Sequence, residues 1–368
     1  MICEDILKQE EKAVFALRQL YRSYGYIPYK MSKFEEYEYY IRNKDFLVSD
    51  RFITFNDTNG KLMALKPDVT LSIIKSSTDT PGCKQKVCYN ENIYRVSDST
   101  RQFREIMQAG LECIGDVDLY DICETVSLAA ESLALIREDF VLQISHLGIL
   151  EAVLTAACPD PGFRQQATAF LAQKNSHDLA RLCADFGVDT AATEMLTLFV
   201  HAYGQRDQVL DQLRSLCGDI APDALRELEQ LSRLLDRSPH SHRILFDFSV
   251  VGNMNYYSGI IFQGFLAGIS GGILAGGQYD KLMRKMERKA GAIGFALYLD
   301  MLEQLSGDPD EFDVDVLLIY RKDTDPARVA QAVAGFTAKG KTVSAQRSIP
   351  PKLRYRQLLE LGKEEAQC

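Results

Sequence analysis

The sequence predicts an α+β protein in which an antiparallel sheet core is interrupted by an all-helical insertion and followed by a short C-terminal α/β unit. Three observations predict this class. Strand-like runs joined by tight turns fill the first 150 residues, five helical segments follow, and the last part of the chain alternates strand and helix patterns. The 368 residues are enough for two or three domains, and 46% apolar with 25% charged residues is an ordinary globular composition.

The first 150 residues begin with a helix and continue mainly as strands. Residues 4–24 carry apolar side chains on one helical face. The stretch "FITFNDTNGKLMALKPD", residues 52–68, predicts a hairpin, because Asn-Gly favours the positive φ of a tight turn. The other elements predicted here are strands at 86–96, 106–115 and 140–146 and a helix at 121–135.

The rest of the chain divides into three parts. Helical segments punctuated by glycine and proline fill residues 151–240. The strand pattern then resumes, and residues 271–305 predict a glycine turn, a basic helix, an apolar strand and a second helix. After a linker at 306–313, we expect a strand, a helix, a strand and a final helix at 352–365. The expected domains are a core of residues 1–150 and 241–305, an insertion at 151–240 and an α/β domain at 313–368.

Charge and cysteine usage bound the function. A net charge of −9 and a pI of about 5.2 argue against a nucleic-acid binder. The nine cysteines are scattered and no export signal precedes them, so free thiols in a cytoplasmic protein are expected. Cys83 and Cys88 are the closest pair but have no second pair nearby, and no metal site is predicted. No apolar run approaches the roughly 18 residues of a membrane span.

Polar side chains stand inside the apolar runs of the core, where an unpartnered group is costly. Gln108 and Glu112 flank Gly110 at a spacing of two, so their side chains share one face of a strand. The side chains that could together form an amino-acid pocket are Asp68, Thr70, Gln108, Glu112, Tyr256 and Tyr257. Acids bind an ammonium group, an amide binds a carboxylate, and an acid with a phenol binds a nitrogen heterocycle. A buried structural network is the alternative, and spacing alone leaves both open.

Two groups of basic residues are ambiguous. Arg95, Arg101 and Arg104 surround an inter-strand loop, which is either a solvated hairpin or a contact for phosphate or carboxylate. The basic stripe from Lys281 to Arg288 is either a solvated helix face or a surface for an anionic partner. The chain has no Walker loop, nucleophile elbow or metalloprotease motif, so the sequence predicts no catalytic residue, metal or cofactor.

Four stretches resemble motifs of the histidyl-tRNA synthetase family, in that family's order. "LKPDVT" resembles "LRPEGT", and "NIYRVSDSTRQFREIMQAGLECIG" is similar to motif 2, which ends in "Q-x-G-x-E". "NMNYYSGIIFQGF" resembles "GLDYYTGTVFE". "AGGQYDKL…AIGFALYLDML" resembles "GGRYDGL…AVGFAIGLERL", which includes motif 3. The resemblance covers most of residues 1–305 and implies a class II aminoacyl-tRNA synthetase-like fold.

The departures from these motifs concern the ATP-handling residues. Met301 stands at the motif 3 arginine, Gly252 stands near a second family arginine, and the motif 2 loop reads "VSDS". Arg95 alone remains of three such arginines. Each lost cation would remove roughly 3–4 kcal/mol of transition-state stabilisation, by analogy with oxyanion sites. Residues 313–368 also correspond to only about half of the family's anticodon-binding domain. An active synthetase is therefore not expected.

A synthetase-like chain that keeps the histidine side and lacks the ATP side resembles the regulatory subunits of ATP phosphoribosyltransferase. The resemblance implies a non-catalytic protein that activates a short catalytic subunit and confers histidine feedback on the first step of histidine biosynthesis. It implies a homodimer, formed through residues 4–40, within a hetero-oligomer. Free histidine is the implied ligand, bound either in the synthetase-like pocket or at a subunit interface.

The resemblance also implies roles for individual residues. The residues implied to bind histidine are Asp68 and Thr70 for the α-amino group, Gln108 for the carboxylate or the amine, Arg95 near the carboxylate, and Glu112, Tyr256 and Tyr257 for the imidazole. Two other functions stay open at this point. A divergent synthetase would catalyse histidine-dependent pyrophosphate exchange, and a sensor of uncharged tRNA would shift tRNA in a salt-dependent gel assay.

Overall fold

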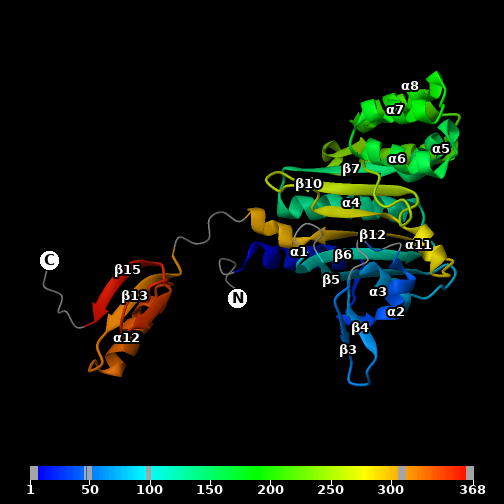
Figure 1. Ribbon diagram of the computed structural model, residues 1–368. Helices are drawn as coiled ribbons and strands as arrows, with labels where there is room; N and C mark the ends of the chain where they lie inside the picture. The colour runs from blue at the N-terminus through cyan, green and yellow to red at the C-terminus, as the bar shows by residue number, and fades with distance from the viewer. Residues whose placement is uncertain (1–6, 45–46, 48–51, 97–100, 306–311, 362–368) are drawn as a thin grey trace. The chain divides into compact units, whose positions relative to one another are not determined.

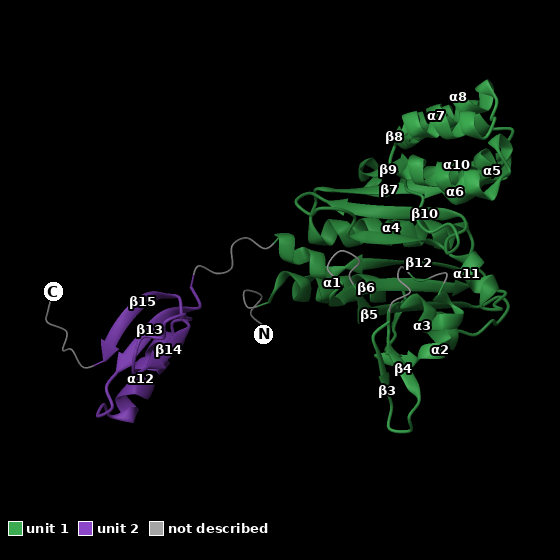
Figure 2. Cartoon of the chain, viewed as in Figure 1, with its two compact units in different colours: residues 1–305 green, residues 306–368 purple. Residues whose placement is uncertain are grey.

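The computed structural model describes residues 7–44, 47, 52–96, 101–305 and 312–361. The chain forms two compact units, residues 1–305 and residues 306–368 (Figure 2). None of the helices in the described ranges is both long and apolar enough to cross a membrane.

Unit 1 is built on a nine-stranded sheet in the order β1-β5-β6-β12-β11-β10-β7-β9-β8 (Figure 1). Its strands are β1 (Ile27–Pro28), β5 (Lys84–Val96), β6 (Phe103–Gly115), β7 (Phe140–His146), β8 (Tyr203–Gly204), β9 (Ile244–Asp247), β10 (Ile260–Leu266), β11 (Leu274–Gln278) and β12 (Gly291–Tyr298). All neighbours from β5 to β7 in this order pair antiparallel, whereas β1 and β9 pair parallel to β5 and β7. The predicted α+β class with an antiparallel sheet core is confirmed.

Two helices, α1 (Gln9–Ser23) and α4 (Leu119–Ile136), cover one face of this sheet (Figure 1). Leu17 and Tyr21 are buried on α1, and the Tyr21 hydroxyl lies 3.0 Å from the hydroxyl of Ser132 on α4. The predicted helix at 4–24 begins at Gln9, and its residues 4–6 lie outside the described ranges. The apolar face of α1 thus closes the main core.

The opposite face of β5 and β6 carries α3 (Thr70–Ser76) and a smaller core. The predicted hairpin forms, with β3 (Thr54–Asn56) antiparallel to β4 (Leu62–Leu65), and β2 (Phe34–Glu36) pairs on the other side of β4. A short helix, α2 (Tyr37–Arg42), follows β2. The sequence analysis missed α3, near whose start the Asp68 side chain accepts the Leu71 N–H at 2.9 Å.

Helices between β7 and β9 make up the predicted insertion. They are α5 (Leu147–Ala157), α6 (Pro161–Ala172), α7 (Ser176–Asp185), α8 (Thr190–Val200), α9 (Arg206–Cys217), α10 (Pro222–Leu235) and the 3-10 turn η3 (Ser241–Arg243). Asp160, Asn175 and Asp189 each cap a helix by accepting backbone N–H groups. The helices belong to the same compact unit as the sheet, and the limits at 151 and 240 stay a prediction.

The last two helices of unit 1 differ from the prediction in length and type. The basic helix α11 covers only Asp280–Lys285, so Arg288 lies beyond it. The helix expected after β12 is a 3-10 helix, η4 (Leu299–Leu305), in which Leu299 and Leu302 are buried. Side chains three residues apart share one side of a 3-10 helix, so this tighter winding still buries the two leucines together.

Unit 2 is a three-stranded parallel sheet in the order β14-β13-β15, with one helix. Its elements are β13 (Val314–Tyr320), α12 (Pro326–Thr337), β14 (Val343–Gln346) and β15 (Tyr355–Leu361). The helix predicted at 352–365 is wrong. Residues Tyr355–Leu361 form a strand, because the free edge of β13 offers backbone partners along this length, and residues 362–368 lie outside the described ranges.

A buried guanidinium ties the helical region together. Arg206, at the start of α9, is 7% exposed. It donates hydrogen bonds to the Ser232 carbonyl, to an Asp236 carboxylate oxygen and to the Ser241 hydroxyl, each at 2.7 Å. These partners lie at the end of α10 and in η3, so one side chain fixes three segments.

We expect Arg206→Ala to lower the free energy of unfolding by about 3 kcal/mol, because it leaves a buried carbonyl and a carboxylate without their donor. The exposed Arg226, paired with Asp223 on the same helix, is the control, and its alanine variant should stay within about 0.5 kcal/mol of wild type. Urea denaturation of the three proteins measures both values. Equal stabilities of the two variants would contradict this role for Arg206.

Candidate functional site

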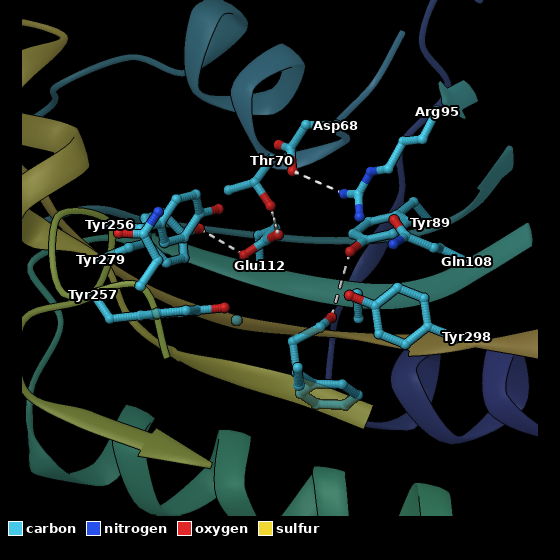
Figure 3. A pocket seen from close by; sticks show the side chains of 15 residues that line it. Asp68, Thr70, Tyr89, Arg95, Gln108, Glu112, Tyr256, Tyr257, Tyr279 and Tyr298 are labelled. Carbon is cyan, nitrogen blue, oxygen red and sulfur yellow. Dashed lines mark hydrogen bonds and ion pairs between the residues drawn. The ribbon is translucent and has the colours of Figure 1, made fainter. Parts of the chain in front are cut away.

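One pocket, on the α3 side of the large sheet, gathers the polar residues that the sequence singled out. All seven predicted ligand-binding residues line it (Figure 3). The pocket has a volume of about 110 Å³ and opens to solvent. Its lining also includes Ala275, and residues that the sequence analysis did not assign: Tyr89, Asn253, Tyr279, Gly294, Phe295, Ala296 and Tyr298.

The pocket floor is formed by β6 and β12, which pair with Glu112 opposite Gly294 and Gly110 opposite Ala296. Glycine is required at both places on this floor. A Cβ on Gly294 would lie 1.8 Å from the Glu112 carboxylate, and one on Gly110 would lie 2.2 Å from the Phe295 carbonyl. Gly294 therefore leaves room for the Glu112 carboxyl group, and Gly110 leaves room for the Tyr89 hydroxyl and the Phe295 carbonyl.

Glu112 is the buried acid of the pocket, with 2% of its surface exposed. The Tyr279 hydroxyl donates to Oε2 at 2.6 Å, and the Thr70 hydroxyl donates to Oε1 at 2.7 Å (Figure 3). Burial raises the pKa of Glu112 to about 8, although both hydrogen bonds act to lower it. In the free protein at neutral pH this carboxyl group is therefore largely protonated, and a cationic ligand group beside it would favour its ionised form.

A second acid, Asp68, lies at the start of α3 and faces the same space. Burial raises the pKa of Asp68, and the Arg95 guanidinium, 3.9 Å away, partly offsets this rise. Arg95 is itself held by donating from Nε to the Pro67 carbonyl at 2.9 Å. One arginine and two carboxyl groups thus leave the site able to accept a further positive charge.

Three tyrosines close the end of the pocket beside Glu112. The ring centroid of Tyr256 lies 4.7 Å from that of Tyr257 and 5.8 Å from that of Tyr279. All three rings stand beside the acid in Figure 3. Aromatic walls with one carboxyl group suit a flat heterocycle that bears an N–H.

The pocket holds one amide, Gln108, which is 3% exposed and comes from the same face of β6 as Glu112. Among the described residues its side chain has no hydrogen-bond partner. A buried amide without a protein partner is costly unless a ligand or water satisfies it. Gln108 is therefore available to bind a polar ligand group.

The sequence analysis predicted Tyr256 and Tyr257 in the site but missed Tyr279 and Tyr89. Tyr279 lay within a recognised motif, "GGQYDKL", and could have been assigned from it. Tyr89 is opposite Gly110 on the neighbouring strand and donates to the Phe295 carbonyl at 3.4 Å. Its pocket position follows from the β5–β6 register, which the sequence did not define.

The basic residues behave differently from one another. Of the three arginines around the inter-strand loop, only Arg95 lines the pocket, whereas Arg101 and Arg104 are exposed. The basic stripe is not uniformly solvated, because Lys281 pairs with Glu151 at 2.9 Å and Arg288 donates to carbonyl groups of α3. No group of three or more histidine, cysteine or acidic residues within the described ranges is arranged to hold a metal ion.

The two positions that depart from the synthetase motifs carry no charged side chain. Met301 is partly buried against the main core. Gly252 has φ +50, and a Cβ there would lie 3.2 Å from the ring of Tyr257. Neither position presents a cation to the pocket. The motif 2 loop residues 97–100 lie outside the described ranges.

The chain is similar in sequence to known proteins. The family model described as histidyl-tRNA synthetase matches residues 3–302. A curated protein of Oceanobacillus iheyensis described as ATP phosphoribosyltransferase regulatory subunit is 28% identical, over 86% of this chain and 80% of its own length. A protein of Desulfitobacterium hafniense with the same description is 29% identical, over 70% and 68%.

Solved structures share the fold. An ATP phosphoribosyltransferase regulatory subunit/histidyl-tRNA synthetase from Bacillus halodurans has a TM-score of 0.75 at 22% identity, covering 96% of this chain and 93% of its own. A chain of the ATP phosphoribosyl transferase complex from Thermotoga maritima has a TM-score of 0.62 at 19% identity, covering 79% and 97%. The class II synthetase-like fold expected from the motifs is confirmed.

The raised pKa of Glu112 predicts a pH-dependent stability. Its folded value, about 8, lies above the usual 4.5, so the folded state binds more protons than the unfolded state between these values. The group's contribution to stability is therefore full below pH 4.5 and falls as pH rises to 8. Between pH 5.5 and 8, the free energy of unfolding of wild type should fall by about 3 kcal/mol relative to that of Glu112→Gln, because glutamine does not titrate.

Urea denaturation of both proteins across this range measures the difference. The exposed Glu138, changed to glutamine, is the control and should follow wild type. If the stability of Glu112→Gln follows that of wild type at every pH, Glu112 is not protonated in the folded protein.

Proposed function

The chain belongs to the histidyl-tRNA synthetase family, and we propose that it serves as a non-catalytic regulatory subunit of ATP phosphoribosyltransferase. In this role it binds a short catalytic subunit, activates it and makes it sensitive to histidine. The seven pocket residues Asp68, Thr70, Arg95, Gln108, Glu112, Tyr256 and Tyr257 bind the histidine.

A single observation carries this proposal. The pocket combines two acids, an amide and aromatic rings, while Met301 and Gly252, which stand where synthetase motifs have arginine, supply no cation. Adenylate formation brings a carboxylate against the α-phosphate of ATP, and cations must offset that charge. A site in which Arg95 is the one arginine among the described lining residues recognises the amino acid without supporting its activation.

The relatives support the same reading. The matched proteins of Oceanobacillus iheyensis and Desulfitobacterium hafniense are described as regulatory subunits. The fold is shared with a chain of an ATP phosphoribosyl transferase complex, which supports a catalytic subunit as partner. Histidine is the end product of the pathway that this enzyme begins, so feedback gives the retained histidine pocket a purpose.

We further propose a homodimer within the hetero-oligomer, located in the cytoplasm. Phe15 of α1 and Ile27 of the edge strand β1 are 52% and 68% exposed, which supports an interface along residues 4–40. The seven cysteines within the described ranges are unpaired, which supports a reducing compartment. The acidic net charge gives no reason to expect nucleic acid as a partner.

Reconstitution with the short catalytic subunit from the same genome tests this function. We expect phosphoribosyl transfer to rise when the chain is added and histidine to inhibit only the complex. Glu112→Gln should raise the half-inhibitory histidine concentration roughly tenfold, because a charge-assisted hydrogen bond becomes a neutral one. Glu138→Gln is the control and should inhibit as wild type does.

The outcome that contradicts the proposal is specific. Histidine-dependent exchange of pyrophosphate into ATP by the isolated chain, well above a blank without protein, would identify a divergent synthetase instead. Failure to activate the catalytic subunit would also count against a regulatory role.

A further inference from the structure

The floor of the pocket sets the distance between its two polar ends. Along the β6–β12 pair, Glu112 faces Gly294, Gly110 faces Ala296 and Gln108 faces Tyr298. Glu112 and Gln108 are four positions apart, which corresponds to about 13 Å along a strand. Between them β6 and β12 carry only Gly110 and Ala296 on this face, and the Tyr89 phenol of β5 lies against Gly110, where a Cβ would come within 2.5 Å of its hydroxyl. A ligand that reaches from one end to the other therefore lies beside Tyr89.

The two ends differ in chemistry. At one end Glu112, Tyr256 and Tyr279 offer a buried acid between aromatic rings. At the other end Gln108 and Arg95 offer an amide and a guanidinium, the groups that bind a carboxylate. An amino acid with a heterocyclic side chain therefore lies with its ring beside Glu112 and its carboxylate toward Gln108.

Tyr298 stands at that carboxylate end, directly opposite Gln108. It is the last residue of β12, shares a face with Gly294 and Ala296, and lies on the side of the pocket away from Tyr256 and Tyr257 (Figure 3). Its N–H donates to the Ile273 carbonyl at 2.8 Å, which fixes the backbone under the ring. In the matched synthetase motif, "AVGFAIGLERL", the corresponding position is glycine, which has no side chain to close this end.

We propose that Tyr298 determines ligand specificity as an end wall, admitting an amino acid with a free carboxylate and excluding amino acids that are extended through that carboxylate as amides, esters or anhydrides. This inference rests on the proposed histidine pocket. It gives the pocket a property that a feedback sensor needs, because the regulator then responds to free histidine and not to histidine already joined to another group.

Binding of three probes to the full-length chain tests the wall. The probes are L-histidine, L-histidinamide and L-histidine β-naphthylamide, and calorimetry gives each Kd. The two amides lack the carboxylate charge equally, so their Kd ratio reports size alone. We expect wild type to bind the naphthylamide at least roughly tenfold more weakly than histidinamide. In Tyr298→Ala the ratio should fall to near one, and in Tyr298→Phe, which keeps the ring, it should stay as in wild type.

The outcomes separate the wall from the site. Equal binding of both amides by wild type, or unchanged discrimination in Tyr298→Ala, overturns the wall while histidine binding still supports the pocket. Discrimination lost in Tyr298→Phe as well would assign the effect to the hydroxyl group and also overturn a steric wall. If none of the three probes binds wild type, the histidine pocket itself is wrong and the wall fails with it.

Discussion

The pairing of β6 with β12 brings Glu112 directly opposite Gly294, and the pocket depends on that one register. Any side chain at position 294 would collide with the carboxyl group, and a shift of one residue would turn Glu112 into the opposite, apolar core. Because the register holds the acid inside, Thr70 and Tyr279 can donate to it from two other elements. Those two hydrogen bonds connect the sheet to α3 and to the segment before α11.

Burial of this acid also explains its chemistry. A carboxyl group with two neutral donors and no adjacent cation prefers to stay protonated in the free protein. Asp68 has a cation, Arg95, but at 3.9 Å, and its pKa is raised as well. The pocket is thus short of positive charge, and a ligand that carries an ammonium group or an imidazole N–H supplies what is missing. The same shortage makes the site unsuited to the anions of ATP.

Much of this arrangement could be predicted from residue patterns, and the rest depended on tertiary contacts. Alternating Gln108, Gly110 and Glu112 predicted a shared face, and all seven predicted site residues line one pocket. Tyr89 and Tyr298 could not be placed, because only strand registers turn them into the pocket. The prediction of a final helix was wrong. The leucine spacing in 352–365 fits a helix, but Tyr355–Leu361 form a strand because their backbone groups pair with the open edge of β13. The helix α3 was missed because a run of seven residues after a proline carries little periodicity.

The proposed pocket recognises histidine without ATP. Equilibrium dialysis of labelled histidine against the full-length chain, with and without Mg-ATP, measures this property. We expect saturable binding of one histidine per chain, with the same Kd in both conditions. An absence of binding would contradict the claim, and so would binding that strengthens when Mg-ATP is present, because that coupling would mean that the nucleotide still occupies the site beside the amino acid.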